Sequence, residues 1–288
     1  MQVRDFLVRA HLSTGFNQNY MQRLVTFLKK THHLPNQEEM ELIISKMSPQ
    51  KQVRFLTEFY GFESQKRLAE NRQFAPFVTI FDDNYPTLLK ESNQAPAVLF
   101  YRGNLSLTES FSLGVVGARQ ATSYGKQSLE ELLPTVVAAK ITTVSGLARG
   151  IDGLAHQITL DCGGQTIAVI GTGLDGYYPR QNARLQEMVA QKGLLLSEYG
   201  LGTPSLPYHF PQRNRIIAGL SQTLLVVEAQ KRSGSLITAN MAADDNRTVL
   251  AIPGQITTGN SDGCNELILA GAKPILSAKD ILEEYQNW

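Results

Sequence analysis

The residues best suited to chemistry in this chain are arginines that stand beside glycine, serine or asparagine. They occur in five separate segments, "GARQ", "GLARG", "YYPRQN", "FPQRNR" and "QKRSGS". Guanidinium groups, hydroxyls and flexible backbone N–H groups are the means by which proteins hold phosphate. One phosphate does not need cations from five segments, whereas a row of phosphates does. The predicted binding residues are Arg119, Ser123, Arg149, Arg180, Asn182, Arg213, Asn214, Arg215, Lys231, Arg232, Ser233 and Ser235.

The segment "FPQRNRIIAGLS" predicts a helix whose first turn carries two arginines. This is unusual, because a helix N-terminus is the positive end of the macrodipole and favours acidic side chains. Pro211 suits the first helical position, which would place Arg213 among free backbone N–H groups able to hold a phosphate. Alternatively, Glu198 or Glu228 at the ends of neighbouring strands neutralises one arginine. Arg213 and Arg215 point about 200° apart on a regular helix, so only one of them faces a given ligand.

The first two glycine-rich segments also allow structural explanations. In "GARQATSYG", Arg119 stands where a dinucleotide-binding turn would carry its second glycine, so a pyrophosphate is not the expected ligand. Thr122 or Ser123 can cap the helix that follows. In "SGLARGID", Asp152 is expected to cap the next helix. His156, one turn further on, is expected to be a packed or exposed histidine rather than a base.

Aromatic residues accompany the cation of the third segment. In "GTGLDGYYPRQN", Tyr177 and Tyr178 offer faces on which bases can stack, and Arg180 offers a phosphate contact beside them. The alternative is that each tyrosine packs beneath its own loop. In "QKRSGS", a helix start with hydroxyls and two cations predicts an anion site. The alternative there is that Ser235 is simply the helix cap and Lys231 and its neighbour are solvated.

The same segments contain no arrangement that predicts catalysis. Ser145 does not stand in a G-x-S-x-G turn, and no histidine and acid are spaced to form a triad with it. The strand ends carry neither paired catalytic carboxylates nor a group of metal ligands. Cys162 and Cys264 are the only cysteines of the sequence and lack the paired spacing of a zinc site. We therefore expect no enzymatic activity, no metal and no cofactor.

From Leu113 onward, short β-rich runs alternate with helical patterns, and these elements must position the arginine segments. The runs are "LGVV", "TTVSG", "TIAVIG", "GLLLSE", "TLLVVEA" and "TVLAIPG". Continuous apolar runs of this length are typical of parallel strands buried on both faces. The alternation predicts an α/β fold with an extended Rossmann-like, mostly parallel doubly wound sheet. In such sheets ligands bind at the carboxyl ends of the strands, where the arginine segments stand.

Three regions differ in composition. Residues 1–65 have helical patterning and few glycines, and they predict a small all-α module. Residues 66–110 contain Pro86 and Pro96 and predict a connector with strands of its own, and residues 111–288 predict the sheet domain. The chain ends at Trp288 soon after its last predicted helix, so no further C-terminal domain is expected.

The composition excludes several classes of protein. An apolar fraction of 42% is normal for a globular chain with a core and argues against disorder. No apolar run reaches the roughly 18 to 20 residues that span a bilayer, and the first ten residues lack the apolar core of a signal peptide. We therefore expect a cytoplasmic protein without a membrane partner. The net charge is only +1, so a polyanion must be bound by locally concentrated Lys and Arg.

Six motifs resemble, in order, those of the DNA-processing protein A family, also called DprA/Smf. They are "GARQATSYG", "SGLARGID", "GTGLDGYYPRQN", "FPQRNRIIAGLS", "VVEAQKRSGSLITA" and "AIPGQI" followed by "GCNELI", and the resemblance runs from about Tyr85 to Ala272. It implies a cytoplasmic bacterial protein that binds incoming single-stranded DNA during natural transformation, the process of competence. It also implies protection of that strand and help in loading the recombinase RecA, with no catalytic step.

The resemblance extends to particular residues and domains. Arg119 and Arg180 match DNA-contacting positions of the family, and the second is frequently lysine there. The N-terminal module is similar in place to the SAM-like domain of some members, whereas the C-terminal winged-helix domain of others is not expected here. Members also form homodimers through the C-terminal part of the sheet domain. There Leu267, Ile268 and Leu269 are consecutive on a predicted helix and cannot all face one core, although packing between neighbouring helices is an equal explanation.

The sequence leaves two other functions open. A Rossmann-like nucleotide hydrolase similar to the phosphoribohydrolases would need an acid near a bound nucleotide, and Glu228 and Asp175 are candidates. However, "RSGSLITA" stands where such enzymes carry a "PGGxGT" loop followed by a glutamate. The other function is that of a recombinase adaptor whose contact with DNA is secondary.

Overall fold

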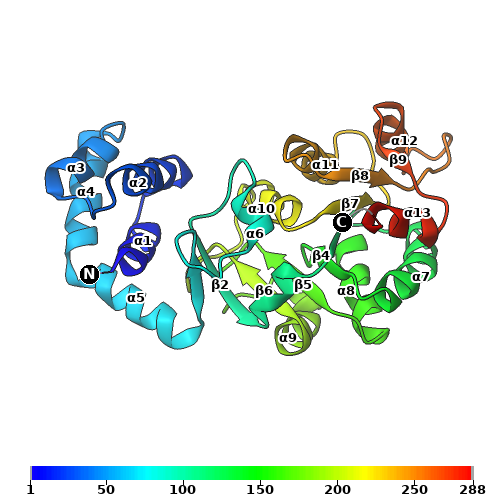
Figure 1. The fold of residues 1–288 in the computed structure, drawn as a ribbon, viewed down its shortest axis with the longest axis horizontal. Coiled ribbons are helices and arrows are strands. Elements are labelled where there is room, and N and C mark those ends of the chain that lie inside the picture. The colour runs from blue at the N-terminus through cyan, green and yellow to red at the C-terminus, as the bar shows by residue number, and fades with distance from the viewer. Residues whose placement is uncertain (1, 287–288) are drawn as a thin grey trace. The chain divides into compact units, whose positions relative to one another are not determined.

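A computed structural model describes residues 2–286 of the chain, which form two compact units (Figure 1). The first unit comprises the residues up to Tyr85 together with Pro96–Phe100. The second comprises Pro86–Ala95 together with the chain from Tyr101 onward. The chain therefore passes three times between the units, and we describe each unit by itself.

Helices make up most of the first unit. Each begins where the sequence supplies a suitable residue: Asn17 accepts backbone hydrogen bonds at the start of the second helix, and Asn36 and Glu39 form a capping box at the third. Gly61 separates the last two helices. The helices are α1 (Val3–Leu12), α2 (Gln18–Thr31), α3 (Gln37–Ile43), α4 (Pro49–Tyr60) and α5 (Phe62–Phe74), so the helical part continues past residue 65.

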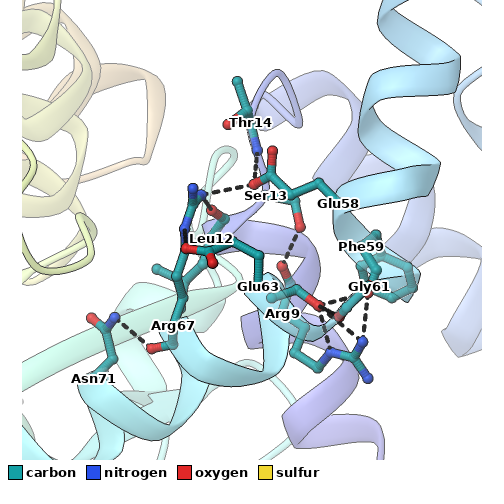
Figure 2. Close-up of polar contacts among 11 residues, drawn as sticks. Arg9, Leu12, Ser13, Thr14, Glu58, Phe59, Gly61, Glu63, Arg67 and Asn71 are labelled. Atoms are coloured by element: carbon teal, nitrogen blue, oxygen red, sulfur yellow. Dashed lines mark hydrogen bonds and ion pairs between the residues drawn. The ribbon is translucent and has the colours of Figure 1, made fainter.

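A buried arginine ties three of these helices together, as Figure 2 shows. Arg9 on α1 is 8% exposed, and its guanidinium donates to the hydroxyl of Ser64 on α5 (3.1 and 2.9 Å) and to the carbonyl of Phe59 on α4. Burial lowers the pKa of Arg9. Nearby, Arg67 on α5 donates to the carboxylate of Glu58 on α4 at 2.7 Å. A buried cation of this kind is stable only when its hydrogen bonds are made, so it fixes the helix arrangement.

Two antiparallel strands follow the helices. β1 (Phe77–Thr79) pairs with β2 (Val98–Gly103), with Val78 opposite Leu99. β2 begins in the first unit and ends in the second. The short helices α6 (Thr87–Lys90) and η1 (Leu105–Glu109) lie before and after it in the chain and belong to the second unit.

The second unit contains a parallel sheet whose strands lie in the order β6-β5-β4-β3-β7-β8-β9. Every residue of the five strands from β6 to β7 in this order is buried, as expected for strands covered on both faces, and in β4 this includes the polar residues Thr142, Thr143 and Ser145. The predicted Rossmann-like fold class is confirmed. The strands are β3 (Ser112–Val116), β4 (Thr142–Ser145), β5 (Thr166–Ile170), β6 (Leu194–Ser197), β7 (Thr223–Val226), β8 (Thr248–Ala251) and β9 (Lys273–Pro274).

Helices cover both faces of this sheet (Figure 1). α8 packs against both α7 and α9, whereas α10 packs against α11 and α6. The core between the strands β3, β7 and β8 and the helices α7 and α8 is formed mainly by leucine, isoleucine and valine side chains. None of the described helices is long and apolar enough to cross a membrane. The helices are α7 (Ser123–Ala138), α8 (Ile151–Asp161), α9 (Ala183–Lys192), α10 (His209–Gly219), α11 (Gly234–Asp244), α12 (Asp262–Leu269) and α13 (Ala278–Leu282), with short turns at η2 (Arg180–Asn182) and η3 (Glu283–Tyr285).

The strand order reverses direction between β3 and β7. The chain moves outward from β3 through β4 and β5 to β6, then returns to β7 and moves outward on the other side. Such a point is where open α/β sheets bind their ligands. The loops at the carboxyl ends of β3, β4 and β5 carry three of the five arginine segments found in the sequence.

Candidate nucleic-acid interface

A pocket of about 290 Å³ opens at the carboxyl ends of β3, β4 and β5, with α10 as one wall. Three of the predicted arginines, from three different segments, meet in it. The fold therefore brings together residues that are nearly a hundred positions apart in the sequence. The pocket is lined by Arg119, Gln120, Gly146, Ala148, Arg149, Gly171, Tyr178, Pro179, Phe210 and Arg213.

Arg119 and Arg149 are the accessible cations of this pocket. Both side chains are exposed, and within residues 2–286 neither forms an ion pair with an acid. The guanidinium carbon of Arg119 lies 5.5 Å from the ring centre of Phe210, a cation–π distance. Two guanidinium groups with donors still available can bind a phosphate oxygen from two sides.

Arg213 is the third cation of the pocket, and it is buried, with 4% of its surface exposed. Its Nη1 donates to the carbonyl of Val169 at 3.0 Å, whereas its Nε has no hydrogen-bond partner. A Cβ atom on Gly146 would lie 1.4 Å from Nη1, so only glycine allows the guanidinium to occupy this place. Burial lowers the pKa of Arg213, and the nearby charge of Arg119 lowers it further, while Asp152 opposes both effects.

The predicted helix start at Pro211 is wrong. α10 begins two residues earlier, at His209, so Pro211 is its third residue. Arg213 is then the fifth helical residue, and the backbone N–H groups of His209 and Gln212 before it already donate to the carbonyls of Leu206 (3.0 Å) and Tyr208 (3.4 Å). Its guanidinium therefore reaches the pocket from the side of the helix and does not share a phosphate with the helix N-terminus.

Arg215 does not face a ligand, and its prediction as a binding residue is wrong. It is 4% exposed, and its Nη2 lies 2.7 Å from both carboxylate oxygens of Glu198. This buried ion pair is the internal neutralisation that the sequence left open for one of the two arginines. Because Arg213 and Arg215 leave α10 in different directions, one lines the pocket while the other joins α10 to the end of β6.

Glu228, the other candidate to neutralise an arginine, has a different partner. It is 1% exposed, and its two carboxylate oxygens accept the backbone N–H (3.0 Å) and the hydroxyl (2.6 Å) of Thr122. Thr122 is the N-cap of α7. A carboxylate of the protein thus occupies the helix start at the switch point, where a dinucleotide would place its pyrophosphate.

The loop that carries Arg149 is held by side chains from two directions. Asn182 donates its amide hydrogens to the carbonyls of Leu147 (3.0 Å) and Ala148 (3.1 Å). Leu147 has φ 57°, a left-handed conformation that a leucine adopts only when its surroundings impose it. The amide of Asn182, predicted to bind DNA, is therefore engaged with the protein backbone, because the loop needs those donors.

Asp152 supports the same loop from below. It is buried, and its carboxylate accepts hydrogen bonds from the backbone N–H groups of Gly146 and Ala148. Burial raises the pKa of Asp152, while the positive charge of Arg213 opposes the shift. The predicted capping role of Asp152 is wrong, because Asp152 is the second residue of α8 and Gly150 occupies the N-cap position.

Two aromatic rings complete the pocket. The ring centres of Tyr178 and Phe210 are 5.2 Å apart, and Tyr178 remains 44% exposed. Tyr177 instead hydrogen-bonds through its hydroxyl to Glu187 at 2.9 Å. Phe210 and Gln120 were not predicted as site residues, although both adjoin motif residues in "FPQRNR" and "GARQ". An apolar ring beside several arginines is the signal that could have identified Phe210.

The remaining predicted residues lie outside the pocket lining. Arg180 is exposed and follows Pro179, a lining residue, in the chain. The prediction of Ser235 is wrong, because its side chain is buried in the first turn of α11. Lys231 pairs with Glu266 at 2.9 Å, and Leu269 is 88% exposed. Ser123 and Arg232 are exposed, and Asn214, Ser233, Leu267 and Ile268 are partly exposed.

His156 lies beneath the pocket and is packed, one of the two outcomes expected for it. It is fully buried, its Nδ1 lies 2.6 Å from the hydroxyl of Thr166, and its Nε2 has no partner. Burial, followed by the charge of Arg213, lowers the pKa of His156 to about 3. The imidazole is therefore neutral at ordinary pH and has no access to a ligand.

The Arg215–Glu198 pair gives a stability prediction. Glu198→Gln should lower the free energy of unfolding by about 3 kcal/mol, because it leaves a buried guanidinium without its counter-charge. Urea titration measures this loss. Lys231→Ala, which breaks an exposed ion pair, is the control and should leave the midpoint almost unchanged. Equal midpoints for the two variants would contradict the structural role of the pair.

His156 gives a prediction on pH dependence. The unfolded chain binds a proton at this histidine near pH 6.5, whereas the folded chain does so only near pH 3. The group should therefore reduce stability by about 1.4 kcal/mol per unit as the pH falls from 6.5 towards 3. Urea unfolding at several pH values should show a shallower decline for His156→Gln. The control His33→Gln, at a side chain that is 55% exposed, should keep the wild-type slope.

Comparison with known proteins agrees with this geometry. Residues 76–286 match the model of the family described as DNA recombination-mediator protein A. DNA processing protein DprA of Streptococcus pneumoniae is 46% identical over 232 residues, which cover 81% of this chain and 82% of that protein. The X-ray structure of DNA processing protein A from Streptococcus pneumoniae has a TM-score of 0.91 and 39% identity, with 99% of both chains covered.

A second solved structure is similar over about three quarters of the chain. It is that of DNA processing protein A from Helicobacter pylori, described for its unique single-stranded DNA binding mode. The TM-score is 0.67 at 27% identity, with 74% of this chain and 97% of that chain covered. The family match covers most of the chain and includes every residue of the pocket. The chain therefore belongs to the DNA recombination-mediator protein A family, as its motifs predicted.

Proposed function

We propose that this protein binds single-stranded DNA without regard to sequence, with the sugar–phosphate backbone crossing the pocket at the carboxyl ends of β3, β4 and β5. The observation that carries the proposal is the meeting of Arg119, Arg149 and Arg213 in one pocket against a single carboxylate, that of Asp152. The pocket has an excess of positive charge that the protein does not neutralise. A phosphate supplies the missing negative charge.

The rings beside the arginines favour a single strand over a duplex. Tyr178 and Phe210 offer apolar faces, and only an unpaired base can leave its neighbours to stack on them. The volume of about 290 Å³ is at the small end for ligand pockets and suits one nucleotide unit rather than a helix about 20 Å across. The Helicobacter pylori relative, studied for its binding of single-stranded DNA, supports this choice.

We further propose that the protein acts without a catalytic step. The carboxylates near the pocket are engaged elsewhere: Glu228 accepts from Thr122, and Asp152 accepts from backbone N–H groups. His156 is buried and neutral. None of these three groups is placed to deliver a proton to a bound nucleotide. This argues against the nucleotide-hydrolase alternative.

The cellular role that we propose is protection of incoming single-stranded DNA in the cytoplasm during natural transformation, and assistance in loading RecA onto it. The support is family membership, since the family is described as one of recombination mediators. An adaptor must hold the strand while leaving it accessible, which suits a shallow row of phosphate contacts better than a deep site.

Self-association belongs to the same proposal. Leu269, at the end of α12, is 88% exposed, and Leu276 is 81% exposed. Apolar side chains exposed to this extent are suited to burial against a second copy of the chain. A homodimer would place two pockets on one assembly and increase the effective affinity for a long strand.

The binding proposal is tested by titration of a fluorescent single-stranded oligonucleotide at several salt concentrations. Arg119→Gln should weaken binding at least about tenfold, equally for different sequences, and should reduce the salt slope by about one. Lys140→Gln is the matched control, because Lys140 is exposed in the connection between α7 and β4, at the opposite edge of the sheet. Turnover of a nucleoside monophosphate, or binding indifferent to Arg119, would refute the proposal.

Self-association is tested by sedimentation at several protein concentrations. Leu269→Glu should shift the protein towards the monomer, because burial of a carboxylate in an apolar interface is costly. Leu42→Glu, at a leucine that is 72% exposed in the helical unit, should leave the distribution as in the wild type. A wild-type protein that stays monomeric at all concentrations would contradict this part of the proposal.

A further inference from the structure

A second aromatic cluster lies where the loop after β6 meets the start of α10, and none of its residues lines the pocket. Tyr199, Tyr208 and His209 form it. The rings of Tyr199 and His209 are stacked at 4.0 Å, with an angle of 24° between their planes. The ring of Tyr208 meets that of His209 edge to face at 4.7 Å and 82°. The three rings form a continuous aromatic assembly at the start of α10.

His209 anchors this assembly to the pocket wall. It is 4% exposed, and its Nδ1 lies 3.0 Å from the carbonyl of Gly171, which lines the pocket. Tyr199 holds the other side of the cluster, since its hydroxyl lies 3.2 Å from Oε1 of Gln212 on α10. The inner two rings are therefore fixed by both packing and hydrogen bonds.

Tyr208 is the outer member, and 59% of it is exposed. An exposed tyrosine in contact with a fixed ring loses little conformational freedom when a ligand stacks on it, because the phenol has only two side-chain torsions. It stands two residues before Phe210, whose ring lines the pocket. The exposed ring is connected to the pocket through His209, whose ring it contacts and whose Nδ1 lies 3.0 Å from the carbonyl of Gly171, a lining residue.

We propose that Tyr208 is a second base-binding subsite, which stacks on the unpaired base next to the nucleotide held in the pocket. The inference rests on the proposed function, in which arginines hold the backbone, and it specifies where a neighbouring base is bound. Stacking is indifferent to base identity, since every base has a π-face. The subsite therefore adds affinity for single strands without adding sequence preference.

The test uses two strands of equal length, oligo-dT and a fully abasic deoxyribose-phosphate strand, titrated into the full chain at fixed salt. Tyr208→Ala should weaken binding of oligo-dT about five- to tenfold, the loss of one stacked base, and should leave binding of the abasic strand unchanged. Tyr208→Phe should bind both strands as the wild type does, because the ring is retained. Phe111→Ala is the control, since Phe111 is 43% exposed directly before β3, at the opposite edge of the sheet.

Salt dependence separates this subsite from the phosphate contacts. Tyr208→Ala should keep the wild-type salt slope, whereas Arg119→Gln should reduce it. The inference is overturned if Tyr208→Ala binds oligo-dT as tightly as the wild type, or weakens both strands equally. If Arg119→Gln has its expected effect in the same experiment, the proposed function stands and only the subsite fails. If the wild type binds neither strand, both fail.

Discussion

The buried guanidinium of Arg213 is the group on which the geometry of the pocket depends. It leaves α10, donates to the carbonyl of Val169 at the end of β5, and lies against Gly146 at the end of β4. A buried cation is stable only while such partners are kept, since removal from water is costly. α10 and the two strand ends are therefore held in one arrangement, and the pocket wall exists before any ligand arrives.

The charge balance around this group explains why the pocket suits an anion. Arg215, two residues further on, is neutralised by Glu198 within the protein. Arg213 has only Asp152 nearby, and that carboxylate also accepts two backbone hydrogen bonds. With Arg119 close enough to lower the pKa of Arg213, positive charge remains in excess. Two arginines in one helix turn thus have opposite roles, and only their partners distinguish them.

The sequence predicts the sheet and the loops of the site well, because buried parallel strands produce apolar runs and glycine-rich loops follow them. It predicts less well where a contact depends on a distant residue. α10 starts at His209 after Tyr208, which makes no side-chain cap, so the local pattern favoured Pro211 instead. The ion pair of Arg215 and the burial of Ser235 depend on packing between elements, which local spacing does not encode.

The pocket lies beside the place where Rossmann-like sheets bind the phosphates of a cofactor. In open parallel sheets the helix start at the switch point binds the phosphates of a cofactor. Here Glu228 accepts both donors of Thr122 at that helix start, so an entering phosphate would meet a carboxylate instead of free N–H groups. The arginines gather instead over β3, β4 and β5, beside the switch point. In the proposed function, the strand would therefore bind beside the switch point, where the arginines are, and not at the helix start that Glu228 occupies.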